Sequence, residues 1–211
     1  MPLRKRSLFG KEGGLFFCTT SFHKQRRLLL GDKYYHIILK SLGFLKQKYN
    51  FEVVAYVIMS SHLHLILFVQ KGTTLSDIMR DFKKFTAYKI RRQLEEDKAF
   101  DLLDSLKIER SQEVTPDTIG TPDTTKSSVP SGVTSRWKQK FKIWEDRFDD
   151  LYLNQEKTLL VKFNYIHNNP VRAGLVKRPE DYPYSSARNY FLKTKDGILE
   201  VDIDFMSGGN S

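Results

Sequence analysis

Apolar and polar residues along the chain follow two periods, and these predict alternating strands and helices. Period-two alternation or short apolar runs rich in Phe, Val, Ile and Thr predict strands, at 14–22, 51–59, 62–69 and 143–153. Apolar residues three and four apart predict helices, at 32–49, 74–92, 156–168 and a short one within 182–191. Asp32 is the expected N-cap of the first helix, and Pro170 is expected to end the third. The second helix either continues or restarts through 100–106.

The order of these elements is strand, helix, strand, strand, helix, strand, followed by a C-terminal helix. This βαββαβ order is typical of an α+β domain with an antiparallel sheet, of the ferredoxin-like or RRM-like kind. Ser60 and Ser61 form a short turn signal, so the strands on either side of them are expected to pair. Helices should pack on one face of the sheet, and His62 and His64 should point to the face or edge met by the last helix.

One segment breaks the pattern. Residues 111–135 are rich in Ser, Thr, Pro and Gly and contain no aromatic residue. Such a segment buries too little apolar surface to offset the entropy lost on ordering. We therefore expect residues 1–211 to form a single domain with a flexible insertion at 111–135.

Two histidines lie on either side of one leucine at the start of the most apolar strand. Side chains alternate faces along a strand, so His62 and His64 should point the same way. Neighbouring imidazoles are natural metal ligands. The alternative is a pair of polar residues on the solvated face of the sheet. Their place in an apolar strand favours the metal site, because a buried polar ring needs a partner.

A second group of polar residues lies about a hundred residues later, in the helix expected at 156–168. Tyr165 and Asn169 are four residues apart and share a helical face if the helix reaches that far. Taken alone, Tyr165 would be interpreted as a core tyrosine and Asn169 as a residue at the C-terminal end of a helix. A tyrosine hydroxyl beside a metal held by two histidines and a third polar ligand could attack a phosphodiester.

The 211-residue chain is basic, with 35 Lys and Arg against 25 Asp and Glu and a formal charge of +10. This charge suggests a polyanionic partner such as nucleic acid. Basic residues interleaved with aromatic ones suit single-stranded nucleic acid, although a solvated helix face would look similar. The candidate DNA-binding residues are Lys83, Lys84, Lys89, Arg91, Arg92, Arg136, Lys138 and Lys140.

Three stretches resemble the single-tyrosine HUH transposases of small bacterial insertion sequences, and most of all their REP-associated tyrosine transposase branch. They are MSSHLHL at 59–65, YIHNNPVRAGLV at 165–176 and PEDYPYSS at 179–186. The resemblance implies that His62, His64 and Asn169 bind magnesium or manganese and that Tyr165 is the nucleophile. It also implies cleavage and rejoining of single-stranded or hairpin DNA through a 5′-phosphotyrosine. The family includes monomers and dimers with shared sites, so a homodimer is one expected arrangement.

Two rival functions stay open at this point. One is a replication-initiation or relaxase-type HUH nickase, and the other is a non-catalytic RRM-like module that binds nucleic acid with exposed aromatics on its central strands. A single cysteine, Cys18, excludes an internal disulfide and fits a reducing compartment. With no apolar run long enough for a membrane span and no signal peptide, a cytoplasmic protein without a membrane partner is expected.

Overall fold

A computed structural model of the chain describes residues 9–10, 13–108, 141–194, 198–203 and 206. The insertion expected at 111–135 lies outside the described residues, as do Arg136, Lys138 and Lys140. Among the described residues, no helix combines the length and apolar character that crossing a membrane requires.

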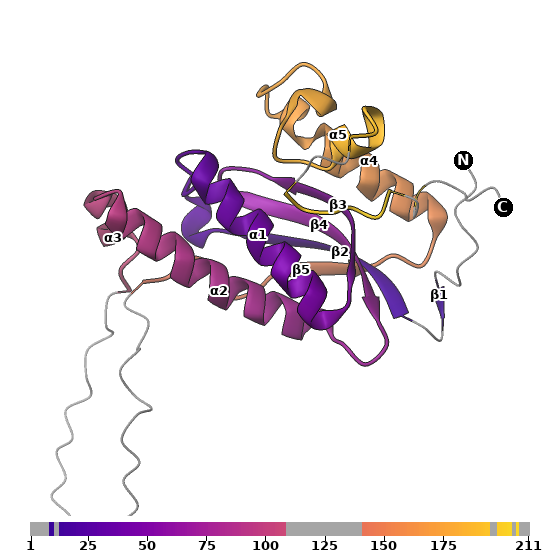
Figure 1. The fold of residues 1–211 in the computed structure, drawn as a ribbon, viewed down its shortest axis with the longest axis horizontal. Helices are drawn as coiled ribbons and strands as arrows, with labels where there is room; N and C mark the ends of the chain where they lie inside the picture. The colour runs from indigo at the N-terminus through magenta and orange to yellow at the C-terminus, as the bar shows by residue number, and fades with distance from the viewer. Residues whose placement is uncertain (1–8, 11–12, 109–140, 195–197, 204–205, 207–211) are drawn as a thin grey trace, which may run out of the picture.

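The centre of the fold is an antiparallel sheet (Figure 1). Its strands are β1 (Phe9–Gly10), β2 (Gly13–Ser21), β3 (Glu52–Ile58), β4 (His62–Gln70) and β5 (Asp149–Tyr152). β2 and β4 are central, β3 flanks β4, and both β5 and the two-residue β1 pair with the other edge of β2. This order is that of a ferredoxin-like sheet, so the predicted α+β class is confirmed.

Helices cover both faces of the sheet. The helices are α1 (Asp32–Tyr49), α2 (Leu75–Glu96), α3 (Phe100–Ser105), α4 (Glu156–Arg172) and α5 (Ala187–Phe191), with 3₁₀ turns at His23–Gln25 and Pro179–Asp181. α1 and α2 lie side by side on one face, while α4 lies across the other (Figure 1). The expectation that all helices share one face is therefore wrong, because each face of this sheet carries enough apolar side chains to need its own cover.

Burial on both faces explains why β4 reads as an almost continuous apolar run. Leu63, Leu65 and Leu67 join the core beneath α1 and α2. Ile66 joins the second core, which includes Leu159 of α4. The side chains that alternate with the leucines of β4 therefore point toward α4, and this alternation places the histidines between the sheet and that helix.

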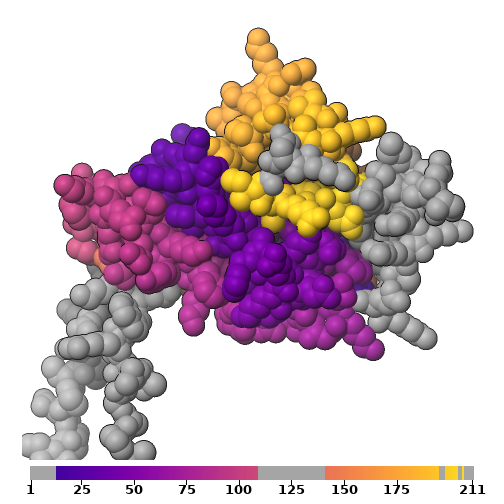
Figure 2. Space-filling model, in the orientation of Figure 1, coloured from indigo at the N-terminus to yellow at the C-terminus, as the bar shows by residue number. Residues whose placement is uncertain are grey.

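The C-terminal part of the chain extends the sheet layer past β3. Val57 and Ser185 form an antiparallel bridge, and the backbone N–H of Ser186 donates to the Tyr56 carbonyl at 3.0 Å. Further on, the Asp202 N–H donates to the Val53 carbonyl at 3.0 Å. In the space-filling view this C-terminal part fills the space between the α1 and α4 regions (Figure 2).

Two predicted helix boundaries are wrong. Asp32 is the first residue of α1 and the N-cap is Gly31; the Asp32 carboxylate instead accepts a hydrogen bond from the Tyr184 hydroxyl. α4 continues through Pro170 to Arg172. A proline near the end of a helix removes only one intrahelical hydrogen bond, and burial of its ring offsets that loss.

The strand expected at 143–153 is also shorter than predicted, because only Asp149–Tyr152 forms a continuous ladder with β2. Before it, Trp144 and Phe22 form an isolated antiparallel bridge, and the Glu145 N–H donates to the Ser21 carbonyl at 3.0 Å. Side chains add to this contact. Trp144 stacks on Phe22, with ring centroids 4.1 Å apart, and its indole N–H donates to Thr86 of α2 at 2.9 Å. The second helix breaks after Glu96 and restarts as α3, which settles the alternative left open by the sequence.

Candidate active site

The two histidines lie side by side on the face of β4 that meets α4. Their ring centroids are 4.9 Å apart, with an interplanar angle of 72°. His64 is 5% exposed, and His62, one pleat nearer the strand end, is partly exposed. Phe17 of the neighbouring strand stacks on His64 at 5.6 Å and 18°. One side of this pair is thus packed into the fold and the other faces α4.

Hydroxyl groups fix the orientation of both imidazoles. Thr19 lies opposite His64 in the β2–β4 register, and its Oγ1 is hydrogen-bonded to His64 Nδ1 at 2.7 Å. Ser61 Oγ pairs with His62 Nδ1 at 3.0 Å. In the tautomer whose Nδ1–H donates to the hydroxyl, Nε2 keeps a free lone pair. Both rings are therefore held as a metal ligand is held by its outer partners.

Burial keeps the imidazoles uncharged. Loss of solvent, together with the nearby His62 and the Lys162 ammonium, lowers the pKa of His64 to about 3. Burial also lowers the pKa of His62. A neutral imidazole is the form that binds a metal ion, because its lone pair is not occupied by a proton.

Tyr165 of α4 approaches the histidine pair directly. Its hydroxyl oxygen lies 3.5 Å from His64 Nε2, and the two rings meet edge to face with centroids 5.1 Å apart. Phe17 contacts the tyrosine ring edge-on at 6.1 Å. The structure therefore brings together residues that are 101 positions apart in one chain.

Asn169 follows Tyr165 by one turn of α4 and is partly buried. Among the described residues, no group of three or more His, Cys, Asp and Glu side chains could hold a metal ion. Asn169 is the third ligand predicted from the sequence, and its amide oxygen has suitable chemistry for a hard cation. Two oriented, neutral imidazoles are donors that a divalent metal accepts, and an amide oxygen is a donor of the same use; the role of Asn169 stays a prediction.

A buried polar contact fixes α4 relative to the sheet. His167 is 1% exposed, and its Nε2 is hydrogen-bonded to Ser186 Oγ at 2.7 Å. That same Ser186 oxygen accepts the backbone N–H of Tyr56 in β3 at 2.9 Å. The Tyr182 hydroxyl adds a bond to the Ile58 carbonyl at 2.9 Å. His167 thus points away from the site, as helical spacing indicates, and ties the tyrosine helix to β3.

Of the basic residues expected to bind DNA, the five that the structure describes lie on α2, across the sheet from the histidines (Figure 1). Lys83 is half-buried, and its ammonium donates to the carbonyls of Glu145, Asp146 and Arg147 at 2.8 to 3.3 Å. Lys83 therefore serves the fold. Lys84, Lys89 and Arg92 are exposed. Two arginines of this helix form ion pairs with acidic residues four positions later, Arg91 with Glu95 at 2.9 Å and Arg92 with Glu96 at 3.7 Å.

Sequence reasoning missed two cations beside the tyrosine. Lys162 Nζ lies 4.6 Å from the centroid of the Phe17 ring and 5.8 Å from that of Tyr165. Arg172 Cζ lies 5.6 Å from the Tyr165 centroid. The signal was present, because positions 162, 165, 169 and 172 recur at three and four residues and share one helical face.

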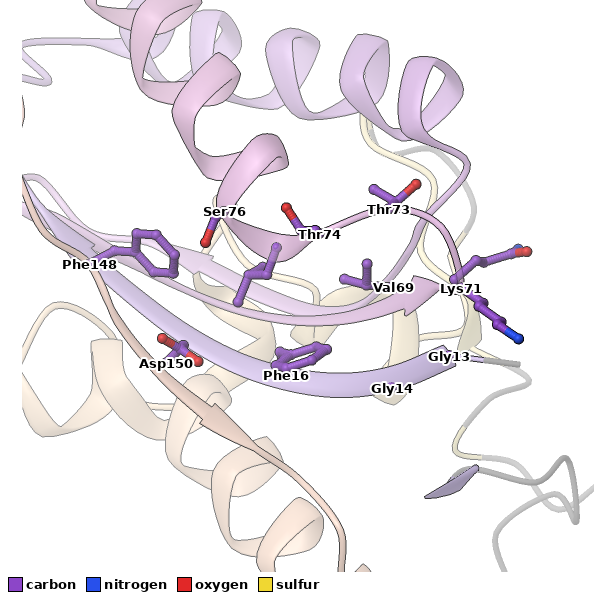
Figure 3. Close-up of a pocket in the computed structure, with 12 residues that line it drawn as sticks. Gly13, Gly14, Phe16, Val69, Lys71, Thr73, Thr74, Ser76, Phe148 and Asp150 are labelled. Carbon is purple, nitrogen blue, oxygen red and sulfur yellow. The ribbon is translucent and has the colours of Figure 1, made fainter. Parts of the chain in front are cut away.

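A separate cavity of about 590 Å³ opens at the other end of β4 (Figure 3). Phe16, Phe148 and Asp150 line one wall, and Thr74 and Ser76 at the start of α2 line the other. None of its lining residues belongs to the histidine–tyrosine cluster. The two sites are therefore distinct.

One family model and two solved structures are similar to this chain. Residues 19–104 match the family model described as "Transposase IS200 like"; this segment contains both histidines and ends before Tyr165. Among solved structures, that of a REP-associated tyrosine transposase bound to a REP hairpin aligns with a TM-score of 0.57 and 21% identity, covering 100% of this chain and 99% of the other. A candidate transposase from Deinococcus radiodurans R1 aligns at a TM-score of 0.42 and 14% identity, covering 80% and 97%. No curated protein matches.

Proposed function

We propose that the chain is a metal-dependent DNA transposase and endonuclease, since residues 19–104 match the family model of IS200-like transposases. It cleaves and rejoins single-stranded or hairpin DNA through a 5′-phosphotyrosine intermediate. The observation that carries this proposal is the 3.5 Å distance between the Tyr165 hydroxyl and His64 Nε2. This short distance supports Tyr165 as the nucleophile and the two histidines as metal ligands.

The chemistry follows from these residues. His62, His64 and Asn169 would hold magnesium or manganese, which supplies polarisation of the scissile phosphate and offsets the charge on its oxygens. The Tyr165 oxygen attacks phosphorus, the bond from phosphorus to the 3′ oxygen breaks, and the proton lost by the tyrosine balances the one gained by the 3′-hydroxyl. The phosphotyrosine keeps the phosphoester bond, so rejoining needs no nucleoside triphosphate.

Hairpin DNA is the proposed substrate. The structurally similar REP-associated tyrosine transposase is bound to a REP hairpin, and the two folds align along the whole chain. The net charge of +10 favours a polyanionic partner. Tyr165 lies beside the histidines of its own chain, which supports a site that one chain completes, and a homodimer would add a second such site.

The RRM-like alternative is disfavoured by the burial of its would-be binding face. An RRM stacks bases on exposed aromatic residues of the central strands. Here Phe17 on the central strand β2 is 8% exposed, and α4 covers that face. Phe51 and Tyr56 are 0% and 3% exposed. A relaxase-type nickase would use the same chemistry on a different DNA site, and the substrate assay below separates the two.

The test is covalent adduct formation with a labelled hairpin oligonucleotide and manganese, read on a denaturing gel. Tyr165→Phe should bind the DNA but form no adduct, since only the hydroxyl is removed. His62→Ala should also lose cleavage, and the double variant should be about as impaired as either single one, because both act on one step. An adduct from Tyr165→Phe would refute the assignment. Cleavage of single-stranded origins in preference to hairpins would favour the nickase.

A further inference from the structure

Two cations lie close to the proposed nucleophile, and no acidic side chain in the described part of the chain neutralises them. Within the described part of the chain, neither Lys162 nor Arg172 forms an ion pair or a hydrogen bond. Nearby Arg178, by contrast, pairs with Asp181 at 2.8 Å and Glu180 at 3.6 Å. The cations beside Tyr165 are therefore free to accept an anion.

Their positions differ in a way that suggests different tasks. Lys162 is half-buried, lies three residues before Tyr165, and has its ammonium over Phe17, the ring that stacks on His64. Arg172 is exposed, ends α4, and lies seven residues after Tyr165. The lysine is thus packed into the reaction centre, and the arginine is on its solvent side.

We propose that Lys162 binds the scissile phosphate that Tyr165 attacks and that Arg172 binds a neighbouring phosphate of the same DNA strand. This inference rests on the proposed function of the site. A lysine is a compact charge that suits oxygens whose negative charge changes during reaction, while an arginine fork suits a static phosphate. As the bond from phosphorus to Tyr165 forms and the bond to the 3′ oxygen breaks, the Lys162 ammonium would stabilise the added charge on the non-bridging oxygens without gaining or losing a proton.

The proposal separates binding from chemistry. Lys162→Met keeps an aliphatic side chain over Phe17 and removes the charge, so the single-turnover cleavage rate at saturating DNA should fall about 100-fold, as for loss of one preorganised donor. Lys162→Arg should restore most of that rate. Arg172→Met should cleave at close to the wild-type rate when saturated, but should bind more weakly, with a salt slope smaller by about 0.7 for one lost contact to single-stranded DNA.

Lys157→Met is the matched control. Lys157 is exposed on the first turn of the same helix, and the eight positions from it to Tyr165 place it about 12 Å away along the helix axis. It should leave the cleavage rate, the affinity and the salt slope unchanged. Circular dichroism and melting temperature show whether each variant is folded.

The outcomes distinguish this inference from the function on which it rests. If Tyr165→Phe loses the adduct while Lys162→Met cleaves at the wild-type rate, the Lys162 assignment is overturned and the nucleophile stands. If Arg172→Met keeps the wild-type salt slope in metal-free binding, its phosphate contact is overturned. If the wild-type protein binds no hairpin or single-stranded DNA, both this inference and the proposed function fail.

Discussion

The hydroxyl of Thr19 should control both the stability of the fold and the metal affinity of the site. Thr19→Val keeps the shape of the side chain but removes the partner of His64 Nδ1, which lies at 2.7 Å on a ring that is 5% exposed. A buried polar group left without its partner costs about 1–3 kcal/mol. For a domain of this size, that corresponds to a fall in melting temperature of about 2–12 °C.

The same change should weaken metal binding. Loss of an outer partner typically lowers the metal affinity of a histidine site about 10- to 100-fold, because the ring is no longer held in one orientation and tautomer. The manganese concentration that gives half-maximal cleavage should therefore rise by that factor. Saturating manganese should restore most of the rate, since Tyr165 is untouched.

The chain offers a matched control in the next residue. Thr20 is 2% exposed, and among the described residues its hydroxyl has no hydrogen-bond partner. It points to the opposite face of β2. Thr20→Val should cost no stability and should leave the manganese dependence unchanged. If the two variants behave alike in both assays, the role given to Thr19 is refuted.

Two further results are expected. Lys83→Met should lower the free energy of unfolding by about 1–3 kcal/mol, because three carbonyls lose their donor, whereas Lys84→Met should leave it unchanged; equal urea midpoints would contradict this. Burial lowers the pKa of both His64 and His167 to about 3, below the 6.5 of an exposed histidine. The unfolded chain then binds protons that the native state does not, so stability present above pH 6.5 is lost as the pH falls toward 3, by up to about 1.4 kcal/mol per pH unit for each histidine. In urea titrations of the metal-free protein, the free energy of unfolding of His167→Gln should depend less steeply on pH than that of the wild type. An unchanged slope would contradict the lowered pKa of His167.

The parts of the site that could be predicted are those governed by local periodicity. Alternation along a strand is enough to place His62 and His64 on one face, and helical spacing is enough to place Tyr165 and Asn169 on another. Both are properties of a few consecutive residues. The βαββαβ order can be predicted in the same way, because each segment shows either the period of a strand or the spacing of a helix. The short connection between β3 and β4 then indicates that these two strands are neighbours in the sheet.

The parts that could not be predicted depend on register and on packing between distant segments. Thr19 supports His64 only because β2 and β4 pair in the register that puts them opposite each other. Lys83 looks like a surface cation in the sequence, and only the fold shows the three carbonyls around its ammonium. Pro170 was expected to end a helix that in fact continues to Arg172, since a local rule takes no account of burial.

The architecture explains how two halves of one site come together. The segment that matches the transposase family model, residues 19–104, carries the histidines, while the tyrosine comes from a helix beyond it. Nothing in the sequence near Tyr165 fixes the distance to His64. That distance depends on how α4 docks, and the docking includes the buried contact from His167 through Ser186 to the backbone of Tyr56. Ser186 belongs to the stretch that follows α4 and bridges to β3, so that stretch helps to set how Tyr165 lies against His64.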